Sequence, residues 1–333
     1  MSRIVVVGGI NMDLHLFGGR RASSGPALVV DHYLTEPGGK GGNVARAVAH
    51  LGGDVRLVGC VGADEFGRRC IDRIRTDGVD VSAVSSSPTT PTGFAAIELD
   101  EGRHRTLVFV PGANDELTWA AVEPVVADLG PDDIVVTQAE VPPGVLQMLS
   151  AHAQGRGVPL FLDPTPPERV GATAIAAAEV ITPDRAEAAA LAGRSDSSDL
   201  WPVLAASDLR LAGARTVVVK TGSTGAVLAD GDGGVVQIPT LSITAKDETG
   251  AGDVFIAALA VRRSEGATWR EAVRFANVAS ALSVADQGLL LPGRESVARA
   301  LDHSASGVPT NPCRASHPRT AGKNSSGSSS QGK

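Results

Sequence analysis

Aromatic residues are scarce in this chain, at 3% of 333 residues, although hydrophobic residues make up 43% of it. Any core must therefore be built from Val, Ala, Leu and Ile. The length allows one large α/β domain or two smaller ones. Basic charge is also in short supply, since the formal net charge is −7. Proteins that bind nucleic acid usually carry a basic surface, so that class of partner is not favoured.

Cysteine is rare as well: the chain contains Cys60, Cys70 and Cys313, and no two of them form a CxxC pair. The sequence therefore indicates neither a disulfide framework nor a cysteine zinc site. No apolar run reaches the roughly 18 residues that a membrane span needs, and the first residues, MSRIVVVGGINMDLHL, lack the long apolar region of a signal peptide. We expect a cytoplasmic protein that binds neither membrane nor nucleic acid.

Short Val- and Ile-rich runs alternate with Ala-rich amphipathic segments along the chain. This alternation is typical of βαβ units and predicts an α/β fold with a mainly parallel sheet covered on both faces. The expected strands lie at 4–7, 55–61, 134–137, 160–162, 180–182 and 216–220. The expected helices lie at 43–51, 65–75, 144–153, 185–192 and 200–211, and a mostly helical C-terminal third contains 251–265, 269–285 and 294–301.

Residues 14–36 and 92–110 do not follow this pattern of alternating strands and helices. They contain short runs in which apolar and polar residues alternate, next to residues typical of turns. In the second segment, apolar runs flank Asp100-Glu101-Gly102, which predicts a hairpin. Both segments fit one small accessory β-sheet that serves as a lid or as a dimer surface. From His303 the chain is rich in Ser, Gly and Pro. We therefore expect a disordered tail at 303–333, after a domain of residues 1–302.

The segment DETGAGDVF places Asp253 after a glycine-rich turn and directly before an apolar run. Such a turn lets backbone N–H groups converge at a helix N-terminus, where an anion is favoured. A carboxylate beside that anion could act as the base in phosphoryl transfer to a hydroxyl. Aspartate is also a common helix N-cap, and this segment alone does not decide between the two roles.

Two further segments carry polar groups next to glycines. In EPGGKGGNVARAVAHLGG, four glycines surround Lys40 and Asn43 opens an apolar helix. This is neither a Walker A loop nor a complete GxGxxG motif, and the glycines fit a close backbone–ligand approach as well as a flexible turn. In GGINMDLHL, Asn11 and Asp13 follow the first strand, at the edge where open α/β sheets bind ligands. The pair suits a polyol, although Asn and Asp are also common turn residues.

Taken together, these segments resemble the ribokinase-like, PfkB-type carbohydrate kinases. GGKGGN is similar to the N-terminal signature of that family, and DETGAGD is similar to its C-terminal signature, DTTGAGD. Other similar segments follow in the expected order: PGAND (111–115), QAEVP (138–142), ITPDRAEAAAL (181–191), KTGSTG (220–225) and FANVASAL (275–282). The resemblance covers residues 3–301. Within the family, the pairing of GINMD with GGKGGN is most similar to the ribokinases, which favours ribose or another free pentose.

The resemblance implies a three-layer α/β/α fold and an ATP- and Mg²⁺-dependent sugar kinase. Asp253 would be the general base, and the N–H groups of Gly250, Ala251 and Gly252 would form an anion hole. The implied sugar site comprises Asn11, Asp13, Gly39, Lys40, Asn43 and Glu140. The implied ATP site comprises Asp184, Lys220, Gly222, Gly225 and Asn277, with Glu187 and Mg²⁺ near the phosphates. A monovalent cation such as K⁺ would lie at Asp247, Thr249, Ala285 and Gly288.

The chain departs from the family pattern at two positions: Asp184 replaces an Asn, and Glu248 replaces a Thr. A carboxylate at position 184 would repel ATP unless Mg²⁺ bridges the two. A nucleoside kinase and a non-catalytic sugar-binding sensor remain alternatives. The intact Asp253 and its glycine turn favour an enzyme, and the shortage of aromatic residues favours a sugar over a nucleoside. A homodimer through the accessory sheet is a further expectation.

Overall fold

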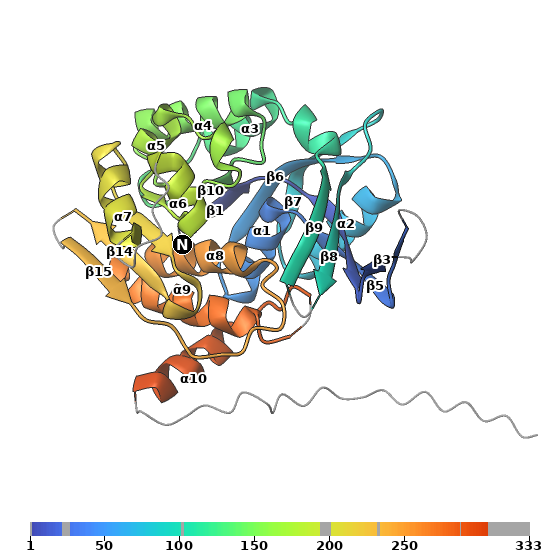
Figure 1. Ribbon diagram of the computed structural model, residues 1–333. Helices are drawn as coiled ribbons and strands as arrows, with labels where there is room; N and C mark the ends of the chain where they lie inside the picture. The colour runs from blue at the N-terminus through green and yellow to red at the C-terminus, as the bar shows by residue number, and fades with distance from the viewer. Residues whose placement is uncertain are drawn as a thin grey trace, which may run out of the picture.

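A large twisted sheet forms the centre of the protein, and helices cover both of its faces (Figure 1). This computed structural model describes residues 2–21, 27–100, 103–193, 201–231, 234–286 and 288–305. Within those residues the sheet has the order β15-β14-β13-β12-β11-β10-β1-β6-β7. The predicted α/β fold with a mainly parallel sheet is therefore confirmed.

Seven of these strands run parallel, and their Val and Ile side chains are largely buried because helices pack on both faces. They are β1 (Ile4–Val7), β6 (Val55–Gly62), β7 (Asp80–Ser87), β10 (Ile134–Gln138), β11 (Leu160–Asp163), β12 (Val180–Ile181) and β13 (Val217–Lys220). The six predicted strands match six of these to within about one residue. The Ser-rich β7 was not predicted, because its partly exposed residues show no clear apolar run.

The three helices predicted in the C-terminal third are present, but two strands in its first part were not predicted. Residues there form the antiparallel strands β14 (Ala226–Asp230) and β15 (Gly234–Ile238), which extend the large sheet beyond β13. The side chains of β15 are mostly exposed, as is usual for an edge strand. This exposure explains the weak apolar pattern of β15, whereas β14 is a buried strand that the sequence analysis missed.

The helices lie close to the predicted ranges, with α3 and α5 in addition. Their bounds are α1 (Lys40–His50), α2 (Glu65–Thr76), α3 (Trp119–Val126), α4 (Pro143–Arg156), α5 (Ala172–Ala177), α6 (Arg185–Ala192), α7 (Trp201–Leu211), α8 (Ala251–Ser264), α9 (Trp269–Ser283) and α10 (Arg294–Ala305). Three short 3₁₀ helices join them: η1 (Gly112–Glu116), η2 (Pro167–Arg169) and η3 (Gly222–Thr224). Because α10 continues to Ala305, His303 belongs to a helix and not to the predicted tail. Residues 306–333, with Cys313, lie outside the described residues.

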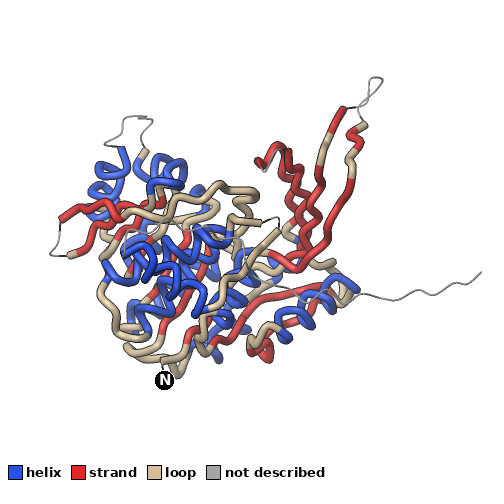
Figure 2. Tube along the Cα trace, turned by 90° about the horizontal axis from the view of Figure 1, so that it is seen from below, coloured by secondary structure: helices blue, strands red, loops and turns tan. Residues whose placement is uncertain are grey.

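A second, smaller sheet stands beside the main body, as Figure 2 shows. It has the order β5-β2-β8-β9 and consists of β2 (Asn11–Phe17), β5 (His32–Gly38), β8 (Gly93–Asp100) and β9 (Arg103–Val110). The predicted accessory sheet and hairpin are confirmed, although residues 101–102 lie outside the described residues. The sheet starts three positions earlier than predicted, at Asn11. Two very short strands, β3 (Arg20–Arg21) and β4 (Leu28–Val29), pair separately.

Two apolar cores hold the layers together, one on each face of the large sheet. Helices α1, α8 and α9 contribute to the first core, and α3, α4 and α7 contribute to the second. Helix α8 is buried from Asp253 to Val261. Because it packs on α1 and α9, its N-terminus is held at the edge of the sheet. No helix in the described part of the chain is long and apolar enough to cross a membrane.

Candidate active site

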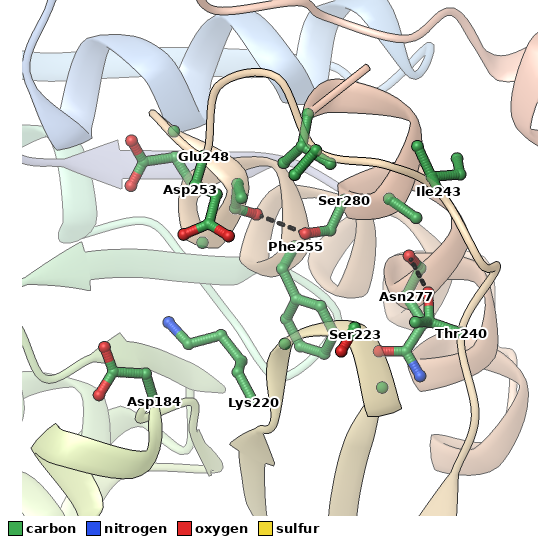
Figure 3. Close-up of a pocket in the computed structure, with 18 of the residues that line it drawn as sticks. Asp184, Lys220, Ser223, Thr240, Ile243, Glu248, Asp253, Phe255, Asn277 and Ser280 are labelled. Carbon is green, nitrogen blue, oxygen red and sulfur yellow. Dashed lines mark hydrogen bonds between the residues drawn. The ribbon is translucent and has the colours of Figure 1, made fainter. Parts of the chain in front are cut away.

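A cavity of about 550 Å³ opens where the parallel strands end, at the first turn of α8. This is the edge of an open α/β sheet at which ligands usually bind. Figure 3 shows Lys220 and the carboxylate of Asp253 directed into the same space, with Asp184 nearby. The cavity continues from these polar groups to a more apolar end lined by Leu241, Ile243, Phe255, Ala281 and Val284.

The carboxylate of Asp253 is buried and held by two groups from α1. Its Oδ2 accepts a hydrogen bond of 2.9 Å from Asn43 Nδ2, and its Oδ1 lies 3.4 Å from Lys40 Nζ. The N-cap of α8 is Gly250, in the left-handed region at φ 73°, and not Asp253. Burial raises the pKa of Asp253, while Lys40 acts in the opposite direction. The structure therefore places Asp253 as a cavity-facing carboxylate with a pKa shifted toward that of a useful base.

The turn before Asp253 needs small residues because other groups approach it closely. A Cβ at Gly250 would lie 2.4 Å from Leu289 Cδ1, and one at Gly252 would lie 3.1 Å from Lys220 Nζ. The N–H of Ala251 donates to the carbonyl of Glu248 at 3.2 Å. Of the predicted anion-hole donors, this leaves the N–H groups of Gly250 and Gly252 for a ligand.

The predicted sugar residues come together around the start of α1. Gly39 has φ 79°, and a Cβ there would lie 2.7 Å from Asn11 N, so this turn requires glycine. Asn11 Oδ1 accepts a hydrogen bond of 2.8 Å from Asn114 Nδ2. Glu140 Oε2 accepts from the backbone N–H of Lys40 at 3.4 Å. Residues far apart in the sequence therefore form one polar wall next to Asp253.

Several acceptors in this wall are buried without a donor. Asp13 Oδ1 and Asn43 Oδ1 have no hydrogen-bond partner among the described residues. Burial raises the pKa of Asp13 to about 7 and that of Glu140 to about 7. An unpaired buried polar group costs roughly 1–3 kcal/mol, so a native protein keeps one mainly where a ligand supplies the partner. The arrangement suits a ligand that carries several hydroxyl donors.

The predicted nucleotide residues line the other side of the cavity. Lys220 ends β13, and Gly222 and Gly225 flank the tight turn that follows it, both with positive φ. Asn277 Nδ2 donates to the carbonyls of Ile238 and Pro239 at 2.9 and 3.3 Å. These bonds fix the loop after β15, so Asn277 shapes the wall of the cavity that it lines.

Asp184 is the N-cap of α6 and not a free charge. Its Oδ1 accepts from Glu187 N at 2.8 Å, and Glu187 Oε2 accepts from Asp184 N at 2.7 Å, which is a capping box. The positive end of the helix dipole offsets part of the negative charge of Asp184. The repulsion of ATP that the sequence suggested is therefore weakened by the local fold.

The predicted metal positions fall into two groups. Glu187 also accepts from Thr165 Oγ1. Both oxygens of Glu187 are therefore engaged within the protein, so a Mg²⁺ ion here would take most of its ligands from phosphates and water. Asp247 Oδ1 accepts from Thr249 N at 2.9 Å, and its Oδ2 accepts from Gly288 N at 3.0 Å. The buried carboxylate of Asp247 thus joins the two loops predicted to surround a monovalent cation, and Ala285 lies in the second of them.

Sequence reasoning missed Asp163. This residue ends β11 and is fully buried, with its Oδ2 3.7 Å from Lys40 Nζ and 3.6 Å from Lys220 Nζ. A usable signal was present, because Asp163 follows a predicted strand at the same sheet edge as Asn11. A second missed contact lies in the small sheet, where the buried His15 Nε2 is 3.3 Å from Glu36 Oε1.

Comparisons with known proteins agree with this geometry. A family model described as pfkB family carbohydrate kinase matches residues 1–294. A ribokinase of Bacillus subtilis (strain 168) is 33% identical over 288 residues, which cover 86% of this chain and 94% of that protein. The crystal structure of a ribokinase from Thermotoga maritima superposes with a TM-score of 0.81 at 30% identity, over 91% of this chain and 100% of that one. Arabidopsis thaliana ribokinase complexed with ribose and ATP superposes with a TM-score of 0.79 at 29% identity, over 90% and 99%.

Proposed function

Because the chain belongs to the pfkB family of carbohydrate kinases, which are phosphotransferases, we propose that it transfers the γ-phosphoryl group of ATP to a hydroxyl of a small free sugar, with ribose or a similar pentose as the substrate. The observation that carries this proposal is the set of buried acceptors beside Asp253. Asp13 Oδ1 and Asn43 Oδ1 have no partner among the described residues, and sugar hydroxyls are the donors that would satisfy them.

The proposed reaction uses groups from both sides of the cavity. Asp253 takes the proton of the acceptor hydroxyl as the oxygen forms its bond to the γ-phosphorus and the bond from phosphorus to the ADP oxygen breaks. The N–H groups of Gly250 and Gly252 and the N-terminus of α8 stabilise the charge on the transferring group. Lys220 lies beside Gly252 and adds a positive charge at this point. Lys40 and Asn43 keep the carboxylate of Asp253 aimed at the hydroxyl.

Two metal ions belong to the same proposal. Mg²⁺ would arrive with ATP and contact Glu187, with Asp184 close by, and it would neutralise charge between the phosphates. A monovalent cation would be held by the carbonyls that Asp247 brings together near Thr249 and Gly288. A kinase that consumes ATP is expected in the cytoplasm, and the buried free thiols of Cys60 and Cys70 fit a reducing compartment.

The test is ATP consumption with Mg²⁺ and K⁺ against a panel of free sugars and nucleosides. We expect turnover with ribose or one related pentose, and loss of turnover when Mg²⁺ is chelated. If K⁺ is needed, replacing it with choline lowers kcat. Turnover with nucleosides alone would overturn the sugar assignment in favour of a nucleoside kinase. No turnover with any compound, together with calorimetric sugar binding, would overturn the catalytic assignment.

We also propose that the small sheet closes over the sugar site and joins two copies of the chain. The edge strand β9 exposes a run of apolar side chains, with Leu107 59% and Val108 54% exposed. An exposed apolar edge strand pairs readily with another strand. We expect sedimentation of a dimer, and Val108→Lys should convert it to a monomer. A monomeric parent protein at micromolar concentration would contradict this proposal.

A further inference from the structure

The buried carboxylate of Asp163 has no role in the proposed reaction. It lies at the end of β11 with 0% of its surface exposed. Its Oδ1 accepts a hydrogen bond of 2.7 Å from Thr165 Oγ1, whereas its Oδ2 has no aligned hydrogen bond among the described residues. A fully buried charge is costly unless opposite charges surround it. The positive groups around Asp163 are therefore the evidence for its role.

Two lysines approach this free oxygen from opposite sides of the cavity. Lys40 comes from the first turn of α1, on the sugar side, and its Nζ lies 3.7 Å from Asp163 Oδ2. Lys220 comes from the end of β13, on the nucleotide side, and its Nζ lies 3.6 Å from the same atom. Both contacts are longer than a strong charged hydrogen bond. Each ammonium group, which carries three N–H donors, can therefore still bind another acceptor.

The lysines meet next to the glycine turn and Asp253, where the proposed reaction would take place. A Cβ built on Gly252 would lie 3.1 Å from Lys220 Nζ and 3.8 Å from Asp163 Oδ2. Lys40 Nζ is also 3.4 Å from Asp253 Oδ1. Lys40 thus lies beside the proposed base and Lys220 beside the glycine turn. Two ammonium groups that approach the same atom would repel each other without a negative charge there. Asp163 supplies that charge.

We propose that Asp163 is a positioning residue that holds Lys40 and Lys220 on either side of the transferring phosphoryl group. This inference rests on the proposed function. In the ground state the lysines share the carboxylate. As negative charge builds up on the oxygens of the transferring phosphoryl group, the two ammonium groups donate hydrogen bonds to those oxygens. Asp163 keeps both lysines in place. The carboxylate itself touches neither substrate, so its effect acts through the lysines.

The test is the variant Asp163→Asn, which keeps the shape of the side chain and removes its charge. We expect kcat to fall by about 30-fold or more, since misplaced electrostatic groups cost that order of rate. The Kd for ATP should stay unchanged or decrease, because the lysines are freed to bind phosphate and an anion is lost. Adenosine binding should not change. A kcat within about threefold of the parent, or ATP binding weakened in proportion to kcat, would overturn the inference.

The pH profile adds a readout that a purely structural role would not move. Burial is the largest cause of the raised pKa of Asp253, and the charge of Asp163 adds to it. Removing this charge in Asp163→Asn should lower the pKa of Asp253. The acidic limb of the pH profile of kcat should therefore shift to lower pH. The matched control is Asp133→Asn, which removes another buried carboxylate, paired with Arg3 at the opposite edge of the sheet. It should lower the melting temperature and leave the kinetic constants and the pH limb unchanged. An unshifted limb in Asp163→Asn would count against the inference.

A double-mutant cycle, measured at a temperature at which Asp163→Asn is folded, separates coupling to the lysine from a general structural loss. Lys220→Gln should cost much less in kcat in the Asp163→Asn background than in the parent, because the lysine is no longer positioned there. Independent, multiplicative losses would refute the coupling. If the parent phosphorylates nothing on the panel, the proposed function fails. In that case, a tighter Kd for ATP with an unchanged Kd for adenosine in Asp163→Asn would support the link between Asp163 and the lysines, and weaker ATP binding would refute it.

Discussion

Replacing Asp253 with Asn should lower kcat by about 10³-fold, because proton removal by a positioned base contributes roughly 10²–10⁴ to such reactions. Asparagine has the same shape and can keep a hydrogen bond with Asn43, but it cannot accept the proton of the hydroxyl. The Kd values for ATP and sugar should stay within about threefold of the parent, since the residue acts mainly in the transition state. Steady-state kinetics and calorimetry on the same samples measure both quantities.

A capping aspartate provides the matched control for this variant. Asp64 is the N-cap of α2, where its Oδ1 accepts from Gly67 N at 2.8 Å. Asparagine caps helices about as well as aspartate does, so Asp64→Asn should leave turnover unchanged. If Asp253→Asn behaves in the same way, with turnover within a few-fold of the parent, Asp253 is not the base.

Much of the fold followed from the sequence because its buried elements are strongly patterned. The apolar run after Asp253 predicted α8, and its burial on all sides is what the structure shows. The start of α1 could not be read in the same way. Glycines are poor helix formers, and only the close packing of Gly41 against the backbone of Gly8 explains why the helix includes them. Tertiary contacts decide such boundaries, and a single sequence does not contain them.

A residue of the candidate site could be predicted when it lies in a distinctive local motif. It was missed when only the fold brings it next to the other site residues. Asp253 and Lys40 lie in glycine-rich segments that are easy to recognise in the sequence. Asp163 stands in an ordinary strand end, and its significance comes from two lysines, 123 positions before it and 57 after it, that the sheet brings to the same point. A pattern-based search would need to examine polar residues at the ends of all parallel strands.

The second large effect is expected for Asp13→Asn. A carboxylate can accept hydrogen bonds from two sugar hydroxyls, and bonds to a charged group contribute about 1.5–3 kcal/mol each. The amide keeps one acceptor and turns an N–H donor toward the second hydroxyl. We therefore expect kcat/KM for the sugar to fall by about 10²-fold, with ATP binding unchanged. The control is Glu98→Gln, which alters another buried carboxylate of the small sheet. Asp13 pairs with Ala95 and Glu98 pairs with Leu16, so Asp13 and Glu98 lie on opposite faces of this sheet.

The same variant has a pH signature with a definite sign. Burial raises the pKa of Asp13 from 3.8 to about 7, so in the parent the sugar KM should rise as pH falls below about 7 and the carboxylate becomes protonated. Asp13→Asn has no such group, and this part of the dependence should disappear. If the KM of the parent stays flat between pH 6 and 8, Asp13 is not an ionised sugar ligand.

Stability should change in the opposite direction to activity. The folded protein binds a proton at Asp13 more tightly than the unfolded chain does. The contribution of this group to stability is therefore fully present below about pH 4 and is lost as pH rises toward 7. Asp13→Asn removes the buried charge and should stabilise the sugar-free protein at pH 8 by on the order of 1–3 kcal/mol, with little effect at pH 4. Denaturant unfolding at the two pH values measures the difference. An equal effect at both values would mean that the carboxylate already has its partner without the sugar, and that its role is to hold the fold.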